Sequence, residues 1–259
     1  MKNRPISRLL FCTILALLLV LVHNNMYAFS PENEDAEKQA LLIIGDAHHA
    51  AFPIYRTIGK TLERTGYATD IVMDYKVPFR DFGKYDLIVL SRYAYNDLVL
   101  SREHQFNFAK GSENLWLTGK QEQAFEDFVN AGGALFLHHD GIGFYPKEGA
   151  IHRLAKAYFL KHPPIGTITV SPTGNLPELT RGIEPFQIED EEFLVEMDES
   201  QTHVFMESHS ATNGRIAQGW AHEYGKGKVV VFIPGHGKKV LFHPMVEECV
   251  ANIVQWLDE

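Results

Sequence analysis

The most informative segment of the sequence is Gly132-Gly133-Ala134-Leu135-Phe136-Leu137-His138-His139-Asp140-Gly141-Ile142-Gly143-Phe144. Its apolar run, Ala134–Leu137, follows two glycines, and such a run is typical of a buried strand in a parallel sheet. In open α/β sheets, ligands bind at the carboxyl ends of the strands. The two histidines and the aspartate that follow the run therefore stand where such a fold binds its ligands.

Strand and helix patterns alternate before this stretch. Ala40–Gly45 is expected as the first strand, Pro53 opens a helix over 54–65, and strands follow at 67–73 and 86–90. Strand, helix and strand at this spacing are typical of a βαβ unit, whose crossover is almost always right-handed. The first half of the chain therefore predicts an α/β fold with a parallel sheet.

The second half of the chain continues the alternation. Thr118 and Gln121 match a capping box, which predicts that a helix begins there. Tyr224–Gly227 predicts a tight turn between strands. The remaining expected elements are a helix over 151–159, strands at 167–170, 202–206, 216–220 and 228–234, and a closing helix over 245–257.

Residues 1–28 have the pattern of an export signal. Basic residues, including Lys2 and Arg8, precede the apolar core Leu9–Val22, and Ala28 is the expected cleavage residue. The core is shorter than the roughly 20 residues that span a bilayer, and the alternative is an uncleaved N-terminal anchor. We expect a periplasmic or extracellular protein with a flexible lead-in over 29–39, one domain over 40–259, and no membrane contact after cleavage.

Composition restricts the classes of function. The chain is 45% hydrophobic and 22% charged, as is ordinary for a globular domain with a sizeable core. A net charge of -9 argues against a nucleic-acid partner, which usually requires a basic face. Cys12 lies in the leader, and Cys249 is expected as a small buried side chain in the last helix. The sequence therefore predicts no disulfide framework and no cysteine zinc site, and it does not define the oligomeric state.

Three segments in series resemble a known family. They are Gly132–His138, then Thr180–Ile183 leading into Asp190 and Glu191, and finally Trp220, Tyr224–Val229, Gly235, His236 and Trp256. In order and spacing they resemble the ThuA-like (trehalose utilisation) family, over nearly all of the chain from Ala40 onward. The resemblance implies a flavodoxin-like, class I glutamine amidotransferase-like α/β fold. It also implies a mostly parallel sheet with helices on both faces and a role in sugar utilisation.

The chain departs from that pattern at the central turn. In this superfamily the turn after the central strand often presents a cysteine nucleophile, but here it reads His138-His139-Asp140-Gly141. Amidotransferase or cysteine-hydrolase chemistry is therefore not expected. Phe193 stands where the family usually has tyrosine, and Pro177–Leu179 stands where it usually has His-Pro. No role carries over to those two places.

Titratable side chains at several predicted strand ends are expected to gather at one edge of the sheet. The predicted catalytic residues are His139, Asp140, Glu191 and His236, and the predicted substrate-binding residues are His49, Trp220 and Tyr224. Imidazoles and carboxylates suit proton transfer near neutral pH. They also suit a divalent metal, although no spacing motif assigns its ligands and the cofactor stays undefined.

Each candidate also has a purely structural interpretation. Asp140 could cap the next helix, and the acidic run 189–192 has the composition of a solvated surface. Trp220 and Tyr224 could pack in the core or in a hairpin. His138 is expected as a hydrogen-bonded core residue, and His162, before Pro163, as a structural residue. The irregular segment 91–117, rich in aromatic and basic groups, is expected as a lid or as decoration.

Two functions from different classes fit these features. The first is an exported enzyme that acts on a glycoside or keto-sugar by hydrolysis, lyase chemistry or isomerisation, without a cysteine nucleophile. Its partner would be a small-molecule carbohydrate. The second is a non-catalytic sugar-binding or accessory domain derived from an enzyme fold, since a fold does not imply a function. A structural subunit of an envelope complex has no positive support in the sequence.

Overall fold

The structure is a computed structural model that describes residues 38–96 and 114–259. The predicted export signal, the lead-in up to residue 37 and the middle of the predicted lid segment lie outside these ranges. Within them, no helix combines the length and the apolar character needed to cross a membrane.

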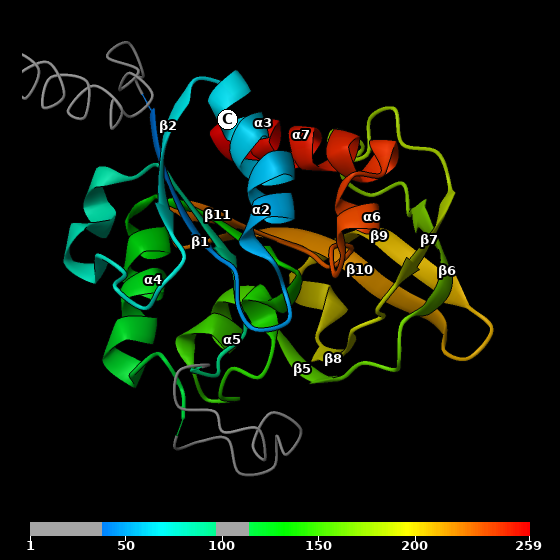
Figure 1. The fold of residues 1–259 in the computed structure, drawn as a ribbon, viewed down its shortest axis with the longest axis horizontal. Coiled ribbons are helices and arrows are strands. Elements are labelled where there is room, and N and C mark those ends of the chain that lie inside the picture. Colours follow the sequence, from blue (N-terminus) through cyan, green and yellow to red (C-terminus); the bar gives the residue numbers. More distant parts are fainter. Residues whose placement is uncertain (1–37, 97–113) are drawn as a thin grey trace, which may run out of the picture. The chain divides into compact units, whose positions relative to one another are not determined.

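A nine-stranded mixed sheet forms the centre of the described chain (Figure 1). In spatial order its strands are β2 (Tyr67–Val72), β1 (Lys38–Ile44), β3 (Leu87–Ser91), β4 (Ala134–His138), β11 (Gly227–Phe232), β10 (Gly214–Tyr224), β9 (His203–Ser210), β6 (Gly166–Pro172) and β7 (Phe186–Asp190). The first strand thus begins at Lys38, two residues before the predicted start of the domain.

The sheet has a parallel half and an antiparallel half. Strands β2, β1, β3, β4 and β11 pair in parallel. From β11 onward, β10, β9, β6 and β7 are added in antiparallel fashion. The expectation of a mostly parallel sheet is therefore corrected. The tight turn at 224–227, which was predicted, folds β10 against β11 as a hairpin, and each later strand pairs antiparallel with its neighbour.

Helices cover both faces of the sheet, because alternate residues of the central strands are buried on opposite sides. In β1, Leu42 and Ile44 belong to one hydrophobic cluster, while Leu41 and Ile43 belong to the other. The first cluster is completed by α2 (Ala51–Ile54), the π-helical turn η1 (Tyr55–Gly59), α3 (Lys60–Arg64), α6 (Lys238–Leu241) and α7 (Pro244–Asp258). The second is completed by α4 (Gly119–Ala131) and α5 (Ala150–Ala155).

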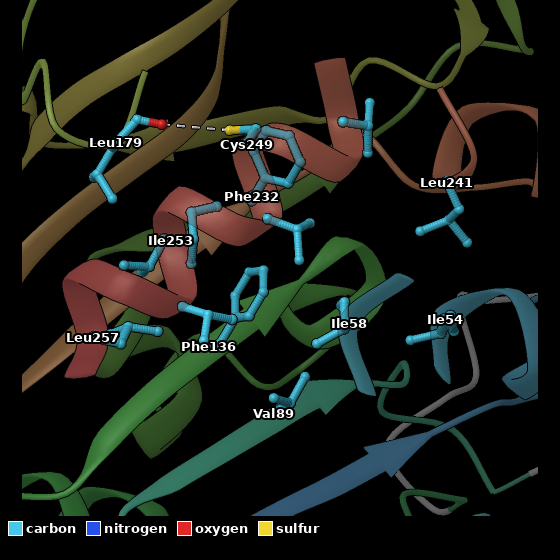
Figure 2. Close-up of a cluster of buried hydrophobic side chains, with 14 of the residues drawn as sticks. Ile54, Ile58, Val89, Phe136, Leu179, Phe232, Leu241, Cys249, Ile253 and Leu257 are labelled. Carbon is cyan, nitrogen blue, oxygen red and sulfur yellow. Dashed lines mark hydrogen bonds between the residues drawn. The ribbon is translucent and has the colours of Figure 1, made fainter. Parts of the chain in front are cut away.

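The last helix, α7, packs along the first face. Figure 2 shows Cys249, Ile253 and Leu257 on its inner side, above Phe136 of β4. The Cys249 thiol lies 3.8 Å from the carbonyl oxygen of Leu179. Cys249 is fully buried, and this burial raises the pKa of its thiol, so it serves as the small core residue that was expected.

Two local predictions meet different outcomes. The capping box at the start of α4 is confirmed, with Thr118 and Gln121 bonding reciprocally. The helix expected over 151–159 is wrong beyond Ala155, because Lys156 takes a left-handed conformation (φ 50°) and a strand follows. That strand, β5 (Ala157–Lys161), pairs with β8 (Leu194–Met197) in a separate two-stranded sheet. Helical periodicity could not reveal this long-range pairing.

Short helical turns complete the described chain. They are η2 (Phe79–Lys84), η4 (His139–Ile142) and η5 (Glu199–Gln201). The turn η4 follows β4 directly, so it carries the two central site residues of the segment 132–144. Gly141 is needed in this turn, because a Cβ there would lie 2.1 Å from the carbonyl oxygen of Leu90.

Candidate functional site

Four side chains converge beside the carboxyl ends of the sheet strands. His49 follows β1, His139 follows β4, Glu191 follows β7 and His236 follows β11. One nitrogen or oxygen atom from each lies within 4.8 Å of the corresponding atoms of the others. We call these four residues the His/Glu cluster. The predicted gathering of strand-end residues is thus present in the structure, whereas their catalytic and substrate-binding roles stay predictions.

The atoms of the His/Glu cluster face one another closely. His49 Nε2 lies 3.1 Å from His236 Nδ1, and His236 Nδ1 lies 3.3 Å from a carboxylate oxygen of Glu191. The other Glu191 oxygen lies 3.5 Å from His139 Nε2. The side chain of His236 is 26% exposed, whereas the other three are buried, so solvent reaches the cluster on the His236 side.

His139 is fixed by a strained turn and by one hydrogen bond. Its backbone has φ 48°, a left-handed conformation that side chains other than glycine rarely adopt. Its Nδ1 lies 2.7 Å from the carbonyl oxygen of Ile233, which can only accept, so Nδ1 carries the proton. Its buried Nε2 has no hydrogen-bond partner among the described residues. The ring also packs against Phe193, with centroids 4.8 Å apart.

Two carboxylates hold His49 from the opposite side. His49 Nδ1 lies 2.8 Å from Asp46 and 3.0 Å from Asp140. Burial opposes a charge on this ring, but the two carboxylates outweigh burial and raise the pKa of His49 to about 11. Burial likewise opposes the charge of Asp140, yet the neighbouring histidines lower the pKa of its carboxyl. Asp140 therefore contacts a site residue instead of capping a helix.

Three of the four residues of the acidic run 189–192 at the end of β7 are buried, namely Asp190, Glu191 and Glu192, whereas Glu189 is exposed. The interpretation of the run as solvated surface is therefore corrected for these three residues. Asp190 accepts hydrogen bonds from the backbone N–H groups of Gly235 and His236 at 2.8 and 3.1 Å. Burial raises the pKa of Asp190. Glu191 is buried too, but its contacts with His139 and His236 lower its pKa. The carboxylates of this run therefore fix the loop that carries His236.

Trp220 and Tyr224 do not lie in the cluster. Trp220 is fully buried, and its indole N–H donates to the carbonyl oxygen of Ala155 at 2.8 Å. Tyr224 lies beside the start of β11, at the opposite edge of the sheet from His236, and its hydroxyl donates to Glu126. These contacts agree with the alternative interpretation, in which both residues serve packing, while their predicted role in substrate binding stays a prediction.

His138 has the structural role that was expected. It is fully buried, with Nδ1 2.8 Å from the Ser91 hydroxyl and Nε2 3.4 Å from the carbonyl oxygen of Pro234. Burial, helped by the neighbouring His139, lowers its pKa to about 3. His138 is therefore neutral across the physiological range and joins β4 to its neighbours.

Sequence reasoning missed two residues beside the cluster. Asp46, the second residue after β1, accepts from the backbone N–H groups of His48 and His49 as well as from the His49 ring. Its place just after a strand end was a usable signal. His162 Nδ1 lies 3.4 Å from Glu191, and its ring stacks on Phe193. No local pattern marked His162, because the connection between β5 and β6 brings it to the cluster.

The arrangement can do two kinds of chemistry. Imidazoles next to carboxylates can move protons to and from a bound substrate. The His/Glu cluster also presents donor atoms that suit a metal ion, as does the smaller group of Asp46, His49 and Asp140. In that smaller group the Asp46 carboxylate already accepts hydrogen bonds from two backbone N–H groups and from the ring of His49. The His/Glu cluster is therefore the better candidate to hold an ion.

Comparison with protein families gives one match over almost the whole chain. The family model described as ThuA, trehalose utilisation, matches residues 39–257. No curated protein sequence matches the chain.

Several solved structures share the fold at low sequence identity. A cytoplasmic protein of Salmonella typhimurium LT2 is 15% identical with a TM-score of 0.62, and the match covers 85% of this chain and 99% of that one. A ThuA-like protein of Parabacteroides merdae is 13% identical with a TM-score of 0.61, covering 85% and 89%. A β-galactosidase of Bacillus circulans is 9% identical with a TM-score of 0.57, covering 86% of this chain and 32% of the enzyme. At these identities the likeness concerns the fold alone.

Proposed function

Since this chain belongs to the ThuA (trehalose utilisation) family, we propose that it is an enzyme of carbohydrate metabolism that acts on a glycoside or keto-sugar. The reaction class is hydrolysis, lyase chemistry or isomerisation, each of which needs protons moved to or from sugar oxygens and carbons. The proposal includes export through the N-terminal signal and a flavodoxin-like, amidotransferase-like ancestry of the fold.

One observation carries the proposal: the His/Glu cluster gathers three imidazoles and a carboxylate at the strand ends. A purely structural set of buried polar groups would be expected to satisfy all its hydrogen bonds. Here His139 Nε2 makes no hydrogen bond among the described residues, and His236 stays partly exposed. The raised pKa of His49 and the lowered pKa of Glu191 are also typical of functional sites.

The residues in and around the His/Glu cluster would have different roles. Asp46 and Asp140 fix the ring of His49, and the backbone bonds of Asp190 fix the loop that presents His236. His236 faces the solvent-accessible side, so it is the residue that would first meet a sugar hydroxyl or carbonyl. No thiol can take part from the described chain, because Cys249, on the inner side of α7, is buried in the core.

The test is a screen of the purified chain against trehalose, other disaccharides and their keto derivatives. The double variant His139→Ala/His236→Ala is expected to lose at least about 100-fold in turnover, the usual worth of positioned acid–base groups. The matched control is His209→Ala, which removes a histidine with a 58% exposed side chain from β9. Undiminished turnover in the double variant would show that the cluster is not the reaction centre.

The competing function is a non-catalytic sugar-binding or accessory domain. It is favoured by the histidine at the turn where the superfamily often presents a nucleophilic cysteine. This function predicts that a sugar raises the melting temperature of the protein while no product forms. Multiple turnover by the pure chain excludes it.

A further inference from the structure

We propose that the His/Glu cluster binds one divalent transition-metal ion of the zinc class. The inference deepens the proposed function by naming the ion at the same site, but its geometric argument stands without any particular sugar reaction.

The spacing of the donor atoms fits a single tetrahedral ion. Zinc lies about 2.0–2.1 Å from imidazole nitrogen and carboxylate oxygen, so two ligand atoms of a tetrahedron lie roughly 3.3 Å apart. In the cluster, His49 Nε2 lies 3.1 Å from His236 Nδ1, and the two oxygens of Glu191 lie 3.3 Å from His236 Nδ1 and 3.5 Å from His139 Nε2. All the donor atoms lie within 4.8 Å of one another, so a small shift completes the tetrahedron.

The ring orientations of two histidines suit metal binding. His139 donates its Nδ1 proton to the carbonyl oxygen of Ile233, so Nε2 is the atom directed at the cluster, where an ion would replace any proton that it carries. His49 directs Nδ1 at the carboxylates of Asp46 and Asp140, which leaves Nε2 for the cluster. Metal-binding histidines almost always donate their second N–H to a carboxylate or a backbone carbonyl. Both outer-sphere patterns are present here.

The unpartnered atom of His139 is an independent sign of a missing ligand. Its Nε2 is inaccessible to solvent and makes no hydrogen bond within the described chain. A buried polar atom without a hydrogen bond destabilises the folded chain. One dication can bind all four converging atoms once the ring protons that face it are released, whereas a water molecule donates only two hydrogen bonds.

The donor set also selects the ion. Three nitrogens and one carboxylate oxygen suit zinc and cobalt, whereas magnesium and calcium prefer all-oxygen sites. Because solvent reaches the cluster beside His236, an oxygen of a small ligand could join the ion there without displacing the buried donors. The ligand class expected at that position is a sugar hydroxyl or carbonyl.

The experiment uses the full chain, purified without a polyhistidine tag and freed of metal with a chelator. Zinc binding is measured by calorimetry and by the metal content after dialysis, and cobalt binding by the visible absorption of four-coordinate Co²⁺. The wild type is expected to bind one ion. His139→Ala and the nearly isosteric Glu191→Gln are each expected to weaken binding at least about 10-fold. His209→Ala should bind as the wild type does.

The outcomes separate the metal site from the proposed function. Circular dichroism of each variant shows whether it folds. If His139→Ala does not fold, the comparison of Glu191→Gln with the wild type tests the metal site. The metal site is overturned if the folded variants bind zinc and cobalt as tightly as the wild type does. It is also overturned if the wild type binds neither ion stoichiometrically. One bound ion without turnover of any sugar supports the metal site while the enzymatic proposal fails. Sugar turnover by a wild-type chain that binds no ion supports the enzymatic proposal while the metal site fails.

Discussion

At the scale of single residues, the cluster depends on a glycine beside it. A Cβ at Gly235 would lie 2.3 Å from His138 Nε2, and the N–H of Gly235 bonds to Asp190. Gly235→Ala is therefore expected to lower the free energy of unfolding by about 1–3 kcal/mol, as overpacking does. The substitution should also displace the neighbouring His236, and zinc binding by the variant should therefore be weaker than that of the wild type.

The matched control for this variant stands two residues further along. A Cβ at Gly237 meets nothing within 4 Å, so Gly237→Ala should change stability by no more than about 0.5 kcal/mol. Urea unfolding of both variants measures the difference. Equal stability of Gly235→Ala and Gly237→Ala would show that the contact with His138 does not constrain the loop.

Asp140 makes a second prediction, which concerns pH. In the metal-free protein the folded pKa of His49 is about 11, above its ordinary value of 6.5. The stabilisation from its carboxylates is therefore complete below about pH 6.5 and is lost as the pH rises toward 11. Asp140→Asn removes one carboxylate and should cost about 3–5 kcal/mol at pH 6, the usual cost of breaking a buried ion pair.

Urea unfolding of chelator-treated protein at pH 6, 8 and 9.5 measures this effect. The wild type should lose stability across the series, and Asp140→Asn should lose less, because part of the pH-dependent interaction is already gone. Asp81→Asn removes an exposed carboxylate as the control. Parallel stability curves for the wild type and Asp140→Asn would contradict the assignment of the His49 pKa to these contacts.

At the scale of elements, a buried arginine joins the ends of two strands. The Arg92 guanidinium donates to the backbone carbonyls of Ile44 and Gly45 at the end of β1, and of Met73 and Asp74 just after β2. It also lies over the rings of Tyr75 and Trp116. These bonds hold the start of the loop that carries Asp46 and His49.

Arg92→Met is expected to lower the free energy of unfolding by about 3 kcal/mol or more, since each buried carbonyl left without a donor costs about 1–3 kcal/mol. Arg92→Lys should recover little, because an ammonium group cannot reproduce the planar fork. Arg80→Met, at an exposed arginine, is the control and should stay within about 0.5 kcal/mol of the wild type. Unchanged stability of Arg92→Met in urea would refute this clamp.

Elements with a strong local signal were predictable from the sequence, and those defined by distant partners were not. The runs at β1, β4 and β11 are apolar on both faces, and the capping box marks the start of α4. By contrast, β5 is a strand only because β8 lies beside it. Likewise, the buried carboxylate of Asp190 accepts from the N–H groups of Gly235 and His236, which lie 45 and 46 residues away along the chain.

At the scale of the whole described chain, the end of the edge strand β7 contacts the loop that follows β11, a strand in the middle of the sheet. β7 is the last strand of the antiparallel half, yet Asp190 at its end bonds to the loop after β11, in the parallel half. The loop after β11 therefore meets the end of β7, although β10, β9 and β6 lie between these two strands in the sheet. The sequence could predict that the ends of parallel strands meet, because β1, β4 and β11 share one direction. Glu191 joins the residues at these strand ends because the loop after β11 meets the end of β7. No local sequence pattern specifies that contact.

The proposed ion would join the two halves of the sheet, because His49, His139 and His236 follow parallel strands and Glu191 follows the antiparallel edge strand. An ion that binds only the folded chain stabilises it by about 2.7 kcal/mol at a free concentration of 100 times its Kd. For a chain of this size that corresponds to a rise in Tm of roughly 5–10 °C. We expect zinc to produce this rise in scanning calorimetry and magnesium to produce none. The double variant His139→Ala/His236→Ala should show no rise with either ion, and an equal rise in that variant would place the ion elsewhere.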